Sequence, residues 1–444
     1  MKKPLQVLLI NPYIYDVSAY SFWSTPLGLL YVGGVLRENG MRVTLLDCLR
    51  EKEEKRREDG RAPFIKERVE SPEATKGTGK RYRRYGISRE EVRTMLCGMA
   101  TPDLVLVTCI MTYWYQGARE IVRLVRDMFP SAKIVVGGIY ASLCYEHARN
   151  HMEGADLIVG NGDMTTFYSF IEESFSLTLR SKPQSFELDR MPYAAFDLYR
   201  QRQFVPLLTS FGCIYRCTYC ASSYLYPRVV RRDPKSVLKE IMYWNSREIS
   251  RFALYDDNFL SIRDGSVKEL LLGISRLPFA LSIYNPNALN ASLIDAETAI
   301  LLKKAHFQEV RLGLETIDPV AQEATGGKVT AGSFEPALRH LLNAGFPRKV
   351  IQAYVLTGLP LQKWEDVKKT IDYAASLGIK VNLAEYTPIP HTEMFEKYHT
   401  FARYPISEEP MFQNNALFPF AWEGFTEENL DEMKAYAREK NEEG

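Results

Sequence analysis

SFGCIYRCTYCASS, residues 210–223, places three of the chain's seven cysteines within eight residues. The spacing is C-x3-C-x2-C, running from Cys213 through Cys217 to Cys220. Clustered thiolates favour zinc or an iron–sulfur cluster. Structural zinc normally has four protein ligands, and neither a fourth cysteine nor a histidine lies in this stretch. Three thiolates on a cubane would leave one iron open to a substrate, so we interpret the trio as the ligands of a 4Fe-4S cluster.

Apolar runs of strand length alternate with helical patterns around this loop. In the second half of the chain the runs are 204–210, 251–256, 279–285, 309–315, 350–358 and 380–386. This alternation predicts βα units with parallel strands. Six units are fewer than the eight of a closed barrel, so we expect a partial (β/α)6 barrel over residues 201–395. Its catalytic groups should lie at the carboxyl ends of the strands.

The first half of the chain shows a similar alternation. Its apolar runs are 5–10, 42–47, 104–109, 133–138 and 156–160, with helical patterns at 28–39 and 116–129. Buried parallel strands covered by helices predict a doubly wound, Rossmann-like α/β domain over residues 1–180. We expect residues 181–200 to be a linker. Residues 396–444 should form a short C-terminal segment with a helix near 427–440.

Residues 50–89 interrupt the first domain with a stretch rich in Lys, Arg and Glu. One interpretation is a solvated insertion between two core strands. The other is a lid that carries basic side chains towards a phosphate or a substrate, because an insertion of this length is often functional. The sequence leaves both open.

Composition excludes several classes of protein. The formal net charge is +1, which argues against a dedicated nucleic-acid binder, since such domains are usually strongly basic. No apolar run approaches the roughly 18 residues that span a bilayer. Three clustered cysteines in an odd total do not resemble a disulfide framework. We therefore expect a soluble, cytoplasmic protein with no membrane span.

The cysteine loop after the first strand of a six-unit barrel resembles the radical S-adenosylmethionine (SAM) superfamily. In that family the open iron binds the methionine moiety of SAM, and reduction of the cluster gives a 5′-deoxyadenosyl radical. Tyr219 matches the aromatic residue that usually lies by the adenine. Each of the other matching groups follows a strand, where a buried acid can instead simply hold a loop. The SAM-binding residues that the resemblance implies are Tyr219, Asp256, Asp257, Asn258, Glu315 and Gly358.

The first domain resembles the cobalamin-binding domain that precedes the barrel in many radical SAM enzymes. The matching residues are Asn11 after the first strand, Thr108 at the end of the third, Gly137 and Gly138 at the end of the fourth, and Gly160 after the fifth. Glycine permits close approach of a cofactor tail to the backbone.

The histidine motif D-x-H-x2-G, which donates a cobalt ligand in many methyltransferases, is absent from the sequence. Its absence is usual in the radical branch and implies that another group or none meets the lower face of the cobalt. Tyr113 and Trp114 are candidates to lie under the corrin, with core packing as the alternative.

The combined resemblance implies a cobalamin-dependent radical SAM methyltransferase. Such an enzyme moves a methyl group from methylcobalamin to a substrate carbon radical. The expected cofactors are a 4Fe-4S cluster, SAM and cobalamin, and a low-potential donor such as flavodoxin or ferredoxin would supply electrons. A non-methylating rearrangement or cyclisation with the same cofactors is the second hypothesis, and a non-catalytic cobalamin-binding protein is the third.

Overall fold

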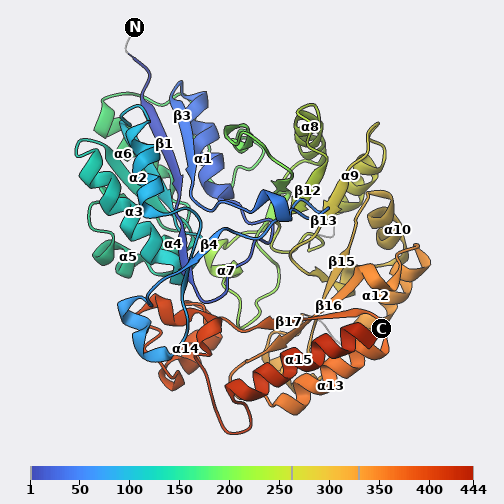
Figure 1. The fold of residues 1–444 in the computed structure, drawn as a ribbon. Coiled ribbons are helices and arrows are strands. Elements are labelled where there is room, and N and C mark those ends of the chain that lie inside the picture. Colours follow the sequence, from blue (N-terminus) through green and yellow to red (C-terminus); the bar gives the residue numbers. More distant parts are fainter. Residues whose placement is uncertain (1–2, 262–263, 329–330, 444) are drawn as a thin grey trace. The chain divides into compact units, whose positions relative to one another are not determined.

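The computed structural model describes residues 3–261, 264–328 and 331–443. The chain forms two compact units, coloured along the sequence in Figure 1. Unit 1 contains residues 1–202 and 406–417, and unit 2 contains residues 203–405 and 418–444. The expected linker 181–200 thus falls in unit 1, and the expected C-terminal segment 396–444 is divided between the two units. Within the described ranges, no helix combines the length and hydropathy needed to cross a membrane.

Unit 1 is built on a five-stranded sheet in the order β3-β1-β6-β7-β8, with every pair parallel. The strands are β1 (Gln6–Asn11), β3 (Arg42–Asp47), β6 (Leu104–Thr108), β7 (Lys133–Gly137) and β8 (Leu157–Ile158). The predicted α/β domain with parallel strands is confirmed. The order reverses between β1 and β6, and in open α/β sheets ligands bind in the crevice outside the carboxyl ends of the strands at such a reversal.

The core of unit 1 follows directly from the sequence pattern. β1 and β6 are almost completely buried, as expected for strands covered on both faces. Helix α1 (Leu27–Glu38) lies so close to β1 that a Cβ on Gly33 would be 2.6 Å from Leu9 Cδ1. Helix α3 (Tyr115–Met128) buries an apolar face against the same domain. The two helices lie near the expected 28–39 and 116–129.

Residues 50–89 contain short strands that join a small sheet. These are β4 (Lys66–Arg68) and β5 (Arg83–Tyr85), and β5 lies between β4 and β2 (Ile14–Asp16) and pairs antiparallel with both. The apolar side chains of Ile14, Phe64 and Tyr85 form a small core under this sheet. Long-range antiparallel pairing of three-residue strands leaves little periodic signal in the sequence.

Among the described residues, unit 2 has seven parallel strands in two hydrogen-bonded sheets, β13-β12-β9 and β14-β15-β16-β17. Their bounds are β9 (Val205–Leu207), β12 (Arg251–Leu254), β13 (Ser282–Tyr284), β14 (Leu289–Asn290), β15 (Val310–Glu315), β16 (Ile351–Thr357) and β17 (Lys380–Glu385). A loop joins β13 to β14, and helices lie between the other successive strands, including α8 (Pro234–Asn245), α9 (Ser266–Ser275), α10 (Ala296–Lys304), α12 (Ala331–Asn343) and α13 (Trp364–Ser376). The predicted partial barrel is confirmed, and α15 (Glu427–Glu443) is its terminal helix.

A cluster of aromatic side chains surrounds helix α5 (Tyr145–His151) of unit 1. His147 Nδ1 lies 2.6 Å from the Tyr140 hydroxyl, and the imidazoles of His147 and His151 stack at 3.8 Å between centroids. Tyr115 meets the His147 ring edge to face at 4.8 Å. Burial, and next the charges of His151 and Arg119, together lower the pKa of His147 to about 4.

This burial predicts an acid-sensitive step in the stability of unit 1. The folded pKa of His147 lies below the usual 6.5, so between pH 6.5 and about 4 the unfolded chain binds a proton that the folded chain does not. The stabilisation is therefore complete above pH 6.5 and is lost as the pH falls through 4. An NMR titration should place the His147 midpoint near pH 4. The variant His147→Gln should lose less stability over this range than the parent, whereas His391→Gln, at an exposed position, should behave like the parent. A His147 midpoint near 6.5 would contradict the assignment.

Candidate functional site

The cysteine loop follows β9 and the short strand β10 (Ser210–Phe211). Gly212 begins it with φ +79°, and a Cβ there would lie 2.5 Å from the Arg228 carbonyl oxygen, so only glycine fits. Cys213 and Cys217 are half-buried and Cys220 is exposed. A hydrogen bond of 3.0 Å from Cys220 N to Cys217 O closes the turn between the last two thiols.

The three polar residues after β12 brace this loop. Asp256 is buried and accepts hydrogen bonds from Thr209 Oγ1 at 2.6 Å and from the Ser210 hydroxyl. Asp257 accepts from Gly212 N at 2.7 Å. Burial raises the pKa of both carboxyls. These contacts match the loop-holding alternative for both aspartates, because their oxygens already bind the loop.

Asn258 is the member of this group that faces a cysteine. Its Nδ2 donates to Cys213 Sγ at 3.6 Å, and its side chain is buried. The Asn258 Oδ1 finds no hydrogen-bond partner within the described residues. A buried polar atom without a partner is uncommon in folded proteins and marks a place for a bound group.

The donors that this loop offers are three thiols, and cysteine thiolates are the ligands of iron–sulfur clusters. Within the described part of the chain, no three His, Cys, Asp or Glu side chains converge on one ion position. A zinc ion would draw all its thiolates to about 2.3 Å from one point. A cubane instead binds each thiolate to a different iron, so its ligands stay further apart. Burial, and next the negative charge of Glu315, raise the pKa of the Cys217 thiol to about 11, so ligation there has to displace a proton.

A cavity of about 310 Å³ opens beside Tyr219 in unit 2. The residues that line it are Tyr219, Pro286, Asn287, Ala288, Gly313, Glu315, Tyr354, Leu356 and Ala384. Glu315 ends β15 with φ +65°, a strained conformation for a residue with a side chain. Its carboxylate accepts a hydrogen bond from Tyr219 and lies 3.5 Å from Lys328 Nζ. Backbone strain of this kind is typical of functional sites.

Lys328 is a site residue that the sequence interpretation missed. Although burial lowers its pKa, the negative charges of Glu315 and then of the three cysteine thiolates raise the pKa of Lys328 overall. The segment before it packs on the cysteine loop: a Cβ on Gly326 would lie 3.0 Å from Cys217 Cα, and Thr218 N donates to Thr325 O. The pair Gly326-Gly327 directly before a lysine was the available signal.

Gly358 lies after β16 with φ +82°, and a Cβ there would approach only Tyr386 N, at 4.0 Å. Other protein atoms therefore leave space beside the Gly358 backbone where a Cβ would lie. Gly358 is not among the residues that line the cavity.

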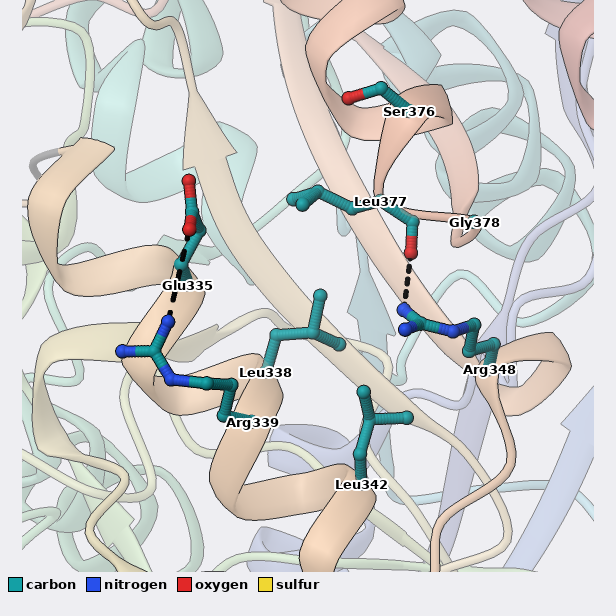
Figure 2. A pocket seen from close by; sticks show the side chains of 8 residues that line it. All are labelled: Glu335, Leu338, Arg339, Leu342, Arg348, Ser376, Leu377 and Gly378. Carbon is teal, nitrogen blue, oxygen red and sulfur yellow. Dashed lines mark hydrogen bonds and ion pairs between the residues drawn. The ribbon is translucent and has the colours of Figure 1, made fainter.

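A second depression of about 360 Å³ lies at the other end of the barrel (Figure 2). Glu335 and Arg339 of α12 face each other there, and Arg348 donates to the Leu377 carbonyl oxygen. Arg348 precedes β16 and Gly378 precedes β17, so this depression is at the amino ends of the strands. Catalytic groups of barrels lie at the opposite ends.

In unit 1 the predicted residues gather at the reversal between β1 and β6. Asn11 ends β1, is buried, and donates from Nδ2 to Asp47 Oδ1 at 2.8 Å. Thr108 ends β6 and is also buried. Gly138 follows β7 with φ 102° and ψ −172°, a region that essentially only glycine occupies. A Cβ there would lie 2.5 Å from Cys109 O and 2.8 Å from Thr108 Oγ1.

The other glycines of unit 1 differ in what surrounds them. A Cβ on Gly160 would lie 2.9 Å from Ala141 O, so Gly160, like Gly138, is required by the protein's own backbone. A Cβ on Gly137 would come no closer than 3.7 Å to Val159 O. Gly137 is therefore the position with open space beside its backbone.

Tyr113 and Trp114 lie in a short turn between β6 and α3. Tyr113 is buried, and the two rings meet edge to face at 5.9 Å. Trp114 Nε1 donates to Asp16 Oδ2 at 2.6 Å, and Asn414 Nδ2 donates to the other oxygen at 2.9 Å. Tyr113 thus matches the packing alternative, while half-buried Trp114 is anchored through its indole nitrogen.

Two family models match the chain. The Radical SAM superfamily matches residues 207–374, which contain the cysteine loop and five strands of the barrel. The B12 binding domain matches residues 88–166, which contain β6, β7 and β8. The chain is a radical SAM protein with a B12-binding domain. A radical SAM domain uses a 4Fe-4S cluster and SAM, and the second domain implies cobalamin.

Curated relatives of this radical SAM protein include methyltransferases. The bacteriochlorophyllide d C-12(1)-methyltransferase of Chlorobaculum tepidum is 23% identical over 282 residues, which are 60% of this chain and 59% of the relative. The cytidylyl-2-hydroxyethylphosphonate methyltransferase of Streptomyces wedmorensis is 20% identical and aligns with 88% of this chain and 81% of its own length. The match therefore spans less than two thirds of the first relative.

Solved structures share the fold of this radical SAM protein. The radical SAM methyltransferase TsrM from Kitasatospora setae, with tryptophan and a SAM analogue bound, superposes with a TM-score of 0.66 at 19% identity, covering 92% of this chain and 83% of TsrM. The cobalamin-dependent enzyme OxsB with aqua-cobalamin bound gives a TM-score of 0.59 at 14% identity, covering 89% of this chain and 55% of OxsB.

Proposed function

We propose that the chain is a cobalamin-dependent radical SAM methyltransferase that methylates a substrate carbon. The observation that carries the proposal is the presence, in one chain, of a thiol trio with an adjoining cavity and a B12-binding domain. The family chemistry requires a low-potential reductant, for which flavodoxin or ferredoxin is the expected donor.

Cys213, Cys217 and Cys220 are proposed as the three cluster ligands. Such a cluster supplies the one-electron reduction of SAM with which the family's radical chemistry begins. Lys328 places a positive charge beside the thiolates, which offsets the repulsion of several anionic ligands in one loop. Asn258 donates towards Cys213 Sγ, a contact that tunes iron–sulfur clusters elsewhere.

The cavity at the carboxyl ends of the strands is proposed to bind SAM. Tyr219 provides an aromatic wall, and Glu315 provides a carboxylate for hydroxyl or amine groups. Gly358 offers an open backbone nearby. Asp256 and Asp257 are proposed to support the SAM site indirectly, because they hold the cysteine loop rather than present free oxygens to SAM.

The crevice at β1 and β6 of unit 1 is proposed to bind cobalamin. Asn11, Thr108 and Gly137 border the crevice, and the tight fit of Gly138 and Gly160 shapes its backbone. Trp114 is the better candidate than Tyr113 for contact with the corrin, because Tyr113 is buried within the domain.

Cyclisation is the second candidate function. The anaerobic magnesium-protoporphyrin IX monomethyl ester cyclase of Synechocystis is 22% identical over 335 residues. This identity is similar to that of the methyltransferases, and the name of this relative specifies ring formation. Such a reaction would use the same cofactors without moving a methyl group.

The deciding experiment follows the methyl group of SAM. The protein is reconstituted anaerobically with iron, sulfide and cobalamin, and is then given a low-potential reductant and SAM labelled on its methyl carbon. A methyltransferase should form labelled methylcobalamin together with S-adenosylhomocysteine, in addition to 5′-deoxyadenosine. Cleavage to 5′-deoxyadenosine without any labelled methylcobalamin would favour the cyclase, and no cleavage would favour a non-catalytic cobalamin-binding protein.

A further inference from the structure

The barrel of unit 2 has a seam between its two sheets. β13 belongs to the first sheet, and β14 with β15 belongs to the second. Among the described residues, the backbone of β13 meets the segment just before β15 at an isolated parallel bridge between Ile283 and Phe307. Backbone groups beyond this bridge need partners of another kind, because buried amides and carbonyls are rarely left unpaired.

Side chains cross the seam at the level of the cavity. The Tyr354 hydroxyl, on β16, donates to Pro286 O, after β13, at 3.2 Å. Asn285 Nδ2 donates to Arg311 O, on β15, also at 3.2 Å. Arg311 Nη1 donates to the Tyr354 oxygen at 3.0 Å. These three bonds connect β13, β15 and β16, and both Tyr354 and Pro286 line the cavity.

Arg311 is itself held by a polar network on the inner face of the barrel. Its guanidinium pairs with Glu309 at 2.7 Å, and Gln352 Nε2 donates to the other Glu309 oxygen at 3.0 Å. Asn382 Nδ2 continues the network to Gln352 Oε1 at 2.8 Å. Alternate residues of a regular strand share a face, so Arg311 shares its face with the cavity residue Gly313, before the register of β15 shifts between Gly313 and Glu315.

The stability of the barrel does not by itself require this polar network around Arg311. Arg311 is only 5% exposed, and well-packed apolar side chains usually stabilise a core as well as a buried ion pair does. An apolar residue could not donate to the Tyr354 oxygen. The guanidinium therefore orients the phenol so that its own hydrogen points to Pro286 O.

We propose that Arg311 and Tyr354 form a clasp that fixes the two sheets around the cavity, and that Arg311 is a positioning residue for SAM binding. The Tyr354–Pro286 bond sets the separation of two cavity walls that come from different sheets. Arg311 acts through Tyr354 and does not itself line the cavity. The inference rests on the proposed function, in which this cavity binds SAM, and it holds for methyl transfer and for cyclisation alike.

The first test removes only the Tyr354 hydroxyl. Tyr354→Phe keeps the ring and should weaken SAM binding about 3–10-fold, the effect of losing one or two hydrogen bonds. The dissociation constant is measured by calorimetry on the anaerobically reconstituted, unreduced protein, so that no turnover occurs. Tyr373→Phe is the matched control, because it removes a phenol bond to Glu335 on the outer helices, and it should bind SAM within twofold of the parent.

The second test asks whether the two residues act as a unit. Arg311→Met should weaken SAM binding at least as much as Tyr354→Phe, and Arg311→Lys should recover part of the loss. The double variant Arg311→Met with Tyr354→Phe should bind no more weakly than Arg311→Met alone, because coupled residues are not additive. Parental SAM affinity in Tyr354→Phe together with a lower melting temperature would assign the clasp a structural role only and overturn the proposal, even where Arg311→Met fails to fold.

Discussion

Cys217→Ala should abolish cluster assembly and SAM cleavage together. After anaerobic reconstitution, iron and acid-labile sulfide should fall to near background, and 5′-deoxyadenosine should become undetectable. Two thiolates cannot hold a cubane that already lacks a fourth protein ligand. The substitution should cost the fold little, about 1 kcal/mol, because Cys217 is half-buried.

Cys97→Ala is the matched control for this loss. Cys97 is exposed, ends helix α2 (Arg89–Cys97) of unit 1, and has no proposed role. Its variant should keep the iron content, the visible absorption and the SAM cleavage of the parent. A Cys217→Ala protein that retained four irons would show that the trio is not the cluster site.

Gly138→Ala should have the second largest effect, on cobalamin binding and on the stability of unit 1. The new Cβ would lie 2.5 Å from Cys109 O in a backbone conformation that costs other residues about 1–3 kcal/mol. The chain must therefore shift at the end of β7. We expect cobalamin affinity to fall at least about tenfold, the factor that 1.4 kcal/mol represents, measured by titration of the visible spectrum.

Two companion variants separate folding from cofactor binding. Gly28→Ala, where a Cβ meets nothing within 4 Å, should leave cobalamin affinity unchanged. Gly137→Ala has room for its methyl group within the protein, so it should fold like the parent and yet weaken cobalamin if the cofactor runs along this backbone. A Gly138→Ala protein with parental stability and parental cobalamin affinity would contradict the argument.

Much of the fold could be predicted because its signals are local. The central strands β1, β6 and β7 of unit 1 contain continuous apolar runs, and parallel strands buried on both faces require such runs. Observed β3 has the predicted bounds of 42–47, β1 is shifted by one residue from the predicted 5–10, and β6 ends one residue before the predicted 109. The β2-β5-β4 sheet was missed, since three-residue strands are too short to show periodicity, and β2 pairs with β5 across 71 positions, from Ile14 to Tyr85.

The candidate site was predictable where residue type alone carries the chemistry. Cys213, Cys217 and Cys220 are close in sequence and therefore close in space. Lys328 was missed because a lysine has no motif of its own, and its place beside the thiols depends on how the segment after Thr325 folds back on the cysteine loop.

The sequence by itself therefore determined the main helices and strands, the thiol trio, and the glycines beside which the structure leaves no room for a Cβ. Only the tertiary structure decided which polar groups are engaged. It assigned Asp256 and Asp257 to the loop backbone and hydroxyls, put Glu315 into a strained conformation, and joined Arg311 to Tyr354 across the seam. The physical reason is that hydrogen bonds and burial depend on partners distant in sequence, whereas strand and helix patterns repeat within a few residues.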